Sequence, residues 1–140
     1  MKASELDARE AIRETLARYA HLVDRGRLDE VAALFTEDAV LEAGDEPPAH
    51  GRAAIRALFA GVGARLAAGG RARIQHHVSS IAIAFADPWT ATAESYFLAV
   101  METGPDHWGR YRDRLVLRDG RWLFMHRRVR VDGRVAARTP

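Results

Sequence analysis

Apolar residues recur every three or four positions through the first half of the chain, which is the spacing of amphipathic helices. The first predicted helix ends at Arg25-Gly26, and a short second helix covers residues 28–35. A third helix follows Gly51 and is expected to be interrupted at Gly61 and Gly63. The apolar stripe of the first helix consists of Leu6, Ile12, Leu16, Tyr19 and Val23.

In the second half, apolar and polar residues alternate, which is typical of strands with one buried face. Asp119-Gly120 between two such segments is a strong signal for a two-residue hairpin turn. The predicted strands cover residues 39–43, 72–86, 90–102, 108–118 and 121–131.

Helices gathered before long sequential strands indicate an α+β fold, with N-terminal helices packed on one side of a mostly antiparallel sheet. Because long strands twist, we expect a strongly curled sheet with a pocket between it and the helices. The chain of 140 residues, 48% of them hydrophobic, fits a single domain over residues 1–140.

A polar segment interrupts the strand predicted at residues 72–86. Successive side chains of a strand face opposite sides, so His76 shares the apolar face of Ile74 and Val78, whereas His77 points away. An imidazole on an apolar face needs a hydrogen-bond partner, and a carboxylate partner would make it a proton acceptor. The alternative is a core histidine bonded to a backbone carbonyl.

Asp24 is the candidate partner, because it follows Val23 of the inward stripe at the end of the first helix. The negative end of the helix dipole disfavours the charge of a carboxylate there, which makes it a good acceptor for an imidazole N–H. An exposed turn at the helix end would explain the same residues equally.

Two charged residues lie among apolar ones in the last two strands. Alternation places Asp113 on the face of Tyr111, and Arg127 on the face of Met125 and Val129. A buried charge is costly unless it is paired, so an ion pair between Asp113 and Arg127 is the simple account. An anion-binding role for Arg127 is the alternative.

Composition narrows the expected partners. The 21 basic and 19 acidic residues give a formal net charge of +2 without a basic block, so we expect no nucleic acid. The absence of cysteine removes thiolate chemistry, and the rings of His76 and His77 diverge on a strand, so we expect no metal. No apolar run reaches transmembrane length, which favours a cytoplasmic protein without a membrane partner.

Several short motifs occur along the chain in a specific order and spacing. They are Tyr19-Ala-His-Leu-Val-Asp24, Leu34-Phe35-Thr-Glu-Asp-Ala39, Gly51 with Ile55, Ile74-Gln-His-His-Val78, Gly109-Arg-Tyr-Arg-Asp113 and Asp119-Gly-Arg-Trp122 through Arg127. On these motifs the chain resembles the SnoaL-like branch of the nuclear transport factor 2-like superfamily over nearly its whole length. The resemblance implies a cone-shaped α+β barrel with an internal pocket, and usually a homo-oligomer, a dimer or a trimer.

Within that superfamily, Asp24 and His76 match the aspartate–histidine pair of scytalone dehydratase and of lindane dehydrochlorinase, and Arg127 matches an active-site arginine of the latter. The second histidine of scytalone dehydratase belongs to the strand equivalent to residues 90–102, which contains no histidine here. The lysine of the dehydrochlorinase appears as Tyr19. The substrate of neither enzyme is therefore carried over.

The resulting hypothesis is a cofactor-independent lyase of the dehydratase type, or an isomerase, that acts on a small cyclic or polyketide-like substrate. Asp24 would orient His76 as the general base, while Arg127 would stabilise developing negative charge or a departing anion. Tyr19 and Tyr111 would bond the oxygens of the substrate. The alternative is a non-catalytic ligand-binding or assembly subunit, such as a ring-hydroxylating oxygenase small subunit. The apolar pocket walls are expected to be Phe35, Phe59, Leu98, Leu115 and Met125.

Overall fold

The structure is a computed structural model that describes residues 3–70 and 73–136. Residue 72, where one strand was predicted to begin, lies outside the described residues. The helices are α1 (Ala3–Asp24), α2 (Leu28–Ala32) and α3 (Arg52–Ala68). The strands are β1 (Phe35–Ala43), β2 (Ala49–His50), β3 (Ile74–Asp87), β4 (Thr90–Met101), β5 (Gly104–Arg118) and β6 (Arg121–Arg134).

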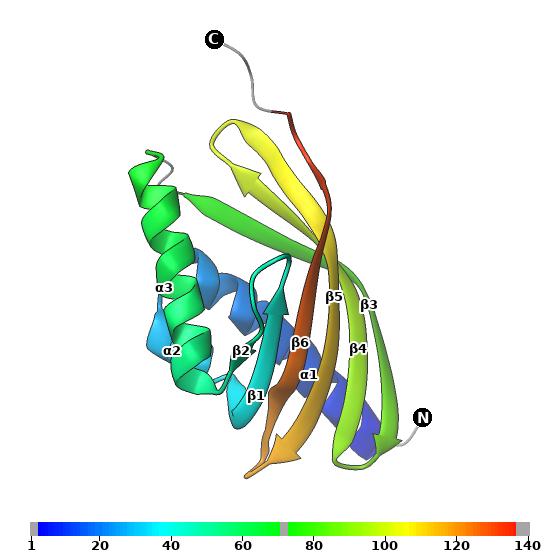
Figure 1. The fold of residues 1–140 in the computed structure, drawn as a ribbon. Helices are drawn as coiled ribbons and strands as arrows, with labels where there is room; N and C mark the ends of the chain where they lie inside the picture. Colours follow the sequence, from blue (N-terminus) through cyan, green and yellow to red (C-terminus); the bar gives the residue numbers. More distant parts are fainter. Residues whose placement is uncertain (1–2, 71–72, 137–140) are drawn as a thin grey trace.

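The strands form one sheet in the order β2-β1-β6-β5-β4-β3. Strand β1 runs parallel to β6, and the other neighbouring strands are antiparallel. Figure 1 shows α1 crossing one side of the sheet, with α3 beside β1 and β2. Helix α1 contacts β3 and β6, while α3 contacts β1 and β2. The predicted α+β class is therefore confirmed, and the strong curl of the sheet stays a prediction.

Helix α3 and strand β1 differ from the prediction because tertiary packing outweighs local preference. Helix α3 continues through Gly61 and Gly63, since its apolar side, with the fully buried Ile55, packs against the sheet. Strand β1 begins at Phe35, which was assigned to the second helix, because Phe35 pairs with Phe124 of β6.

The predicted hairpin turn between β5 and β6 is confirmed. Asp119 and Gly120 have φ angles of 51° and 74°, so both central residues adopt the left-handed conformation of a type I′ turn. Aspartate and glycine tolerate this conformation better than most residues, which is why the dipeptide predicts the turn.

A β-bulge in β6 changes which side chains face the core. Arg114 pairs with His126 and Leu115 pairs with Phe124, which leaves Met125 as the extra residue. The predicted alternation, with Met125 on the face of Arg127, is therefore wrong. The bulge turns Phe124 inward on the same face as Arg127, and both are fully buried.

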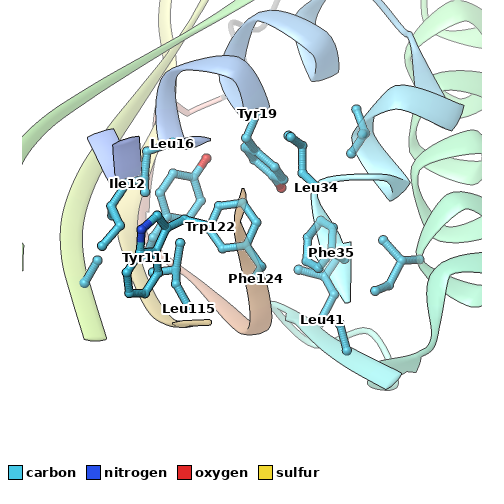
Figure 2. Packing of buried hydrophobic residues seen from close by; sticks show 14 of the residues in the cluster. Ile12, Leu16, Tyr19, Leu34, Phe35, Leu41, Tyr111, Leu115, Trp122 and Phe124 are labelled. Carbon is cyan, nitrogen blue, oxygen red and sulfur yellow. The ribbon is translucent and has the colours of Figure 1, made fainter. Parts of the chain in front are cut away.

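The core lies between the helices and the inner face of the sheet, and Tyr19 of α1 is at its centre. Figure 2 shows the Tyr19 ring close to Leu34, above Phe35 and Phe124. The ring centroid of Tyr19 is 5.8 Å from Phe124, 5.9 Å from Phe59 and 6.0 Å from Tyr111, all in edge-to-face contacts. Such aromatic pairs each contribute roughly 0.5–1.5 kcal/mol beyond the burial of their area.

Replacing Gly61 or Gly63 with alanine should raise the free energy of unfolding by about 0.5–1 kcal/mol each. Both glycines are helical, and an added Cβ would meet nothing within 4 Å. Gly109→Ala is the opposite control, because its Cβ would collide with the backbone carbonyl oxygen of Arg130. Urea unfolding followed by circular dichroism measures all three variants. Lower stability in both helix variants would contradict the prediction.

Candidate active site

The end of helix α1 brings Asp24 to the edge of the sheet. Gly26 has a φ of 67°, and the N–H of Arg27 donates to the carbonyl of Leu22 at 3.0 Å. The N–H of Gly26 also donates to the carbonyl of Val23 at 3.0 Å, which completes a Schellman-type helix end. The helix therefore ends at Asp24, whose side chain extends towards β3.

Asp24 binds His76 of β3 through both of its carboxylate oxygens. Oδ1 lies 2.6 Å from the ring nitrogen Nδ1, and Oδ2 accepts the backbone N–H of His76 at 3.0 Å. The side chains of Asp24 and His76 are only 17% and 13% exposed. The predicted contact is confirmed, and the alternative of a histidine bonded only to a backbone carbonyl is wrong. Residues 25–27 do form an exposed helix-ending turn, but the Asp24 side chain faces His76 instead of solvent.

The contact also determines which nitrogen of His76 can accept a proton. An ionised carboxylate accepts hydrogen bonds and cannot donate them, so Nδ1 carries the hydrogen that faces Asp24. In the neutral ring, Nε2 is then the free acceptor. An imidazole that a carboxylate holds at Nδ1 in this way can act as a general base through Nε2.

His76 faces a cavity of about 930 Å³ between the helices and the inner face of the sheet. This volume is within the usual range for small-molecule sites. Asp24 is not part of the cavity lining and lies behind His76. The lining residues that concern the chemistry are Tyr19, Phe59, His76, Phe97, Asp106, His107 and Tyr111.

Tyr19 and Tyr111 line this cavity, as predicted, and both are buried. Burial raises the pKa of Tyr19 to about 12, although the nearby Arg127 acts in the opposite direction. Burial, and then the neighbouring Tyr19, also raise the pKa of Tyr111. Both phenols therefore stay protonated at neutral pH, so they can donate hydrogen bonds to an oxygen in the cavity.

Arg127 is fully buried and pairs with Asp113, as predicted. Nε of Arg127 lies 2.9 Å from Oδ1 of Asp113, and Nη2 donates to Oδ2 at 3.3 Å. The guanidinium carbon lies 3.6 Å from the ring centroid of Tyr111 and 4.1 Å from that of Tyr19. Arg127 is absent from the cavity lining, contrary to the expected contact with a substrate, because these rings and that of Phe124 cover it.

Of the five expected apolar wall residues, the structure places Phe59 in the cavity lining and the other four elsewhere. Phe35 and Leu115 are fully buried in the core. Leu98 lies on the outer face of the sheet, 36% exposed, because alternation along β4 turns its two neighbours inward. Met125 is displaced from its expected position by the bulge in β6.

The cavity is lined by a second histidine–carboxylate pair, which sequence reasoning missed. Nδ1 of His107 lies 2.8 Å from Oδ2 of Asp106, and both residues line the cavity. The ring centroid of His107 is 6.3 Å from that of His76. Strand β5 begins at Gly104, earlier than predicted, so His107 lies inside it. Extending the alternation upstream from Tyr111 would have placed His107 on the inner face.

The described part of the chain has two further properties that bear on function. It contains no group of three or more histidine, aspartate or glutamate side chains that could hold a metal ion. Within residues 3–70 and 73–136, no helix is both long and apolar enough to cross a membrane.

The helices over a mixed sheet and the cavity between them define an α+β fold of the nuclear transport factor 2-like, or cystatin-like, class. A solved protein of that description from Novosphingobium aromaticivorans is 28% identical, with a TM-score of 0.80 over 91% of this chain and 84% of that one. The chain belongs to the SnoaL-like domain family, whose model matches residues 4–128.

Other solved structures resemble the chain along most of its length. A protein provisionally named scytalone dehydratase, from Novosphingobium aromaticivorans, is 27% identical, with a TM-score of 0.84 over 100% of this chain and 94% of that one. LinA has a TM-score of 0.81 over 93% of this chain and 89% of its own, but at 17% identity it shows the fold alone. The comparison with curated proteins found no match.

Replacing Arg127 with methionine should destabilise the protein by about 3 kcal/mol at about pH 8, because Asp113 is left buried without its cation. Burial already raises the pKa of Asp113 to about 6, against the opposing effect of Arg127. A carboxyl whose folded-state pKa is raised stabilises the fold when protonated, and this contribution is lost as the pH rises through that pKa. Without Arg127, the stability that the fold loses as Asp113 ionises should be greater. The difference in unfolding free energy between the wild type and the variant should therefore be smaller at about pH 5 than at about pH 8.

Chemical denaturation of the wild type and the variant at both pH values measures this difference. The double variant Asp113→Asn with Arg127→Met is the matched control, because it removes both charges. Its stability should be closer to the wild type than that of the single variant, and should depend less on pH. A deficit of equal size at both pH values would contradict the predicted role of Asp113.

Proposed function

We propose that this protein is a cofactor-independent lyase of the dehydratase type, or a related isomerase, that acts on a small cyclic or polyketide-like compound. The observation that carries the proposal is the contact of Asp24 with His76, at 2.6 Å, beside the cavity. A histidine oriented in this way removes a proton next to a carbonyl group, which is the first step of both reaction types.

The proton transfer uses the free nitrogen of His76. Nε2 accepts the proton from the carbon next to the carbonyl, while Nδ1 keeps its hydrogen bond to Asp24. The carboxylate then stabilises the imidazolium that forms, and holds the ring in one orientation through its second bond to the backbone N–H. In a dehydratase the electron pair next expels a hydroxyl group; in an isomerase the proton returns at another carbon.

Negative charge develops on the carbonyl oxygen of the substrate during this step. Tyr19 and Tyr111 line the cavity as neutral phenols and are the proposed donors to that oxygen. Arg127 lies behind both rings, so we assign it an electrostatic and structural role without direct contact with the substrate. Phe59 and Phe97 contribute apolar surface for a ring of the substrate.

Two further observations support this reaction class. The cavity volume of about 930 Å³ accommodates a compound with one or a few rings. The similar protein provisionally named scytalone dehydratase covers the whole of this chain at 27% identity. The rival proposal, a binding or assembly protein of the same fold, predicts that the wild type binds a ligand without turnover.

His76→Gln and Asp24→Asn should each lower the turnover of the substrate, because one removes the base and the other removes the group that orients it. For His76→Gln we expect a loss of about 100-fold to 10,000-fold in kcat, the usual contribution of a general base. The measurement is the loss of water from a panel of cyclic β-hydroxy ketones, followed by absorbance of the conjugated product. The far-ultraviolet circular dichroism spectrum establishes that each variant is folded.

His77→Gln is the matched control, because His77 is the next residue of β3 and is exposed on the outer face. Its turnover should equal that of the wild type. Full activity in His76→Gln would rule out the base assignment. A wild type that binds the ketones but turns none of them over would favour the rival proposal.

A further inference from the structure

His76 and His107 occupy one row across the inner face of the sheet. His76 of β3 pairs with Ala99 of β4, and Ala99 also pairs with His107 of β5. Neighbouring strands lie about 4.8 Å apart, so the backbones of β3 and β5 are separated by roughly 10 Å. The two ring centroids are nevertheless only 6.3 Å apart. The rings therefore lean towards each other over the small, fully buried side chain of Ala99.

A β-bulge explains how Asp106 and His107 both reach the cavity. Adjacent residues of a regular strand point to opposite faces. Here Ala99 pairs with His107 and Val100 pairs with Pro105, so Asp106 is an extra residue of β5. Bulges change the direction of a side chain in this way, and the result is the 2.8 Å contact between Oδ2 of Asp106 and Nδ1 of His107.

The cavity thus contains two imidazoles, each held at Nδ1 by its own carboxylate. Asp24 approaches His76 from the end of α1, and Asp106 approaches His107 from within β5. Both histidine side chains are mostly buried, at 13% and 19% exposure. In each neutral ring, Nε2 is left to exchange a proton with a ligand.

We propose that His107, oriented by Asp106, is the proton donor to the leaving group, which is therefore a hydroxyl group β to the carbonyl. This inference rests on the proposed lyase function and assigns the second half of the reaction. Each ring nitrogen reaches an atom about 3 Å away, so two rings whose centroids are 6.3 Å apart can serve neighbouring atoms of one bound molecule.

The step balances without a further reactant. Nε2 of neutral His76 takes the proton from the carbon next to the carbonyl, and a carbon–carbon double bond forms as the carbon–oxygen bond at the β position breaks. Nε2 of protonated His107 gives its proton to the departing oxygen, which leaves as water. His76 ends protonated and His107 ends neutral, and exchange with solvent restores both before the next turnover.

An experiment that tests this role of His107 compares two leaving groups on the same ring system. One probe is a tetralone that carries a β-hydroxyl group and loses water to form naphthol. The other is its acetate ester, whose carboxylate departs without needing a proton. Formation of naphthol is followed by fluorescence, and the uncatalysed rate of each probe is subtracted.

His107→Gln should lower kcat on the hydroxy ketone by about 100-fold or more, and kcat on the ester by less than about 3-fold. Asp106→Asn should show the same preference for the ester with a smaller loss, because Asp106 acts through His107 as a positioning residue. Retained turnover of the ester also demonstrates that the altered site is folded. His76→Gln should lower kcat on both probes by about 100-fold or more, and His77→Gln should change neither.

Two outcomes would overturn the assignment of His107 while the proposed function stands. One is a fully active His107→Gln on the hydroxy ketone, and the other is an equal loss on both probes, each with an inactive His76→Gln. A wild type that turns over neither probe would instead contradict the proposed function, and the role of His107 would be rejected with it.

Discussion

The contact between Asp24 and His76 joins the helical layer to the free edge of the sheet. Strand β3 is at the edge of the sheet, so the N–H groups on its outer side have no neighbouring strand to supply a hydrogen-bond acceptor. Asp24 accepts one of these N–H groups at 3.0 Å with one oxygen and holds the imidazole with the other. Farther along the same strand, Nη1 of Arg9 donates to the carbonyl of Ile83 at 2.9 Å. Helix α1 is thus anchored to β3 at two points, and the contact of Asp24 lies where Val23 of α1 and His76 of β3 line the cavity.

A different interaction, the buried ion pair of Arg127 and Asp113, lies behind Tyr19 and Tyr111 of the cavity lining. A buried ion pair is often no more stabilising than apolar residues of the same volume, so stability alone does not explain it. The guanidinium lies against the rings of both tyrosines that line the cavity. It opposes the effect of burial on the pKa of Tyr19. A fixed positive charge behind neutral phenols also makes them stronger hydrogen-bond donors, without entering the cavity itself.

The regular parts of this architecture could be predicted from the sequence because they follow periods. Helical spacing predicted α1, and alternation predicted that His76 faces inward. Asp113 and Arg127 were predicted to pair because each is a charged residue on the apolar face of one of two neighbouring strands. The start of β1 could not be predicted, since Phe35 joins it only through pairing with β6. The wrong position of Leu98 could have been avoided, because strict alternation along β4 is enough to place its side chain on the outer face.

The residues that were missed or misplaced lie where the strands depart from regular alternation, and the same departures shape the cavity. Without the bulge in β5, Asp106 would point away from the side chain of His107. Without the bulge in β6, Phe124 and Arg127 would face opposite sides, and the ring at 4.6 Å would no longer cover the guanidinium. Ala99 has a comparable role, because its small side chain leaves the space over which the two histidine rings approach. The hydrophobic pattern of a sequence predicts neither a bulge nor the importance of one small residue. Here Ala99 and the extra residue Asp106 determine how closely the two imidazoles approach.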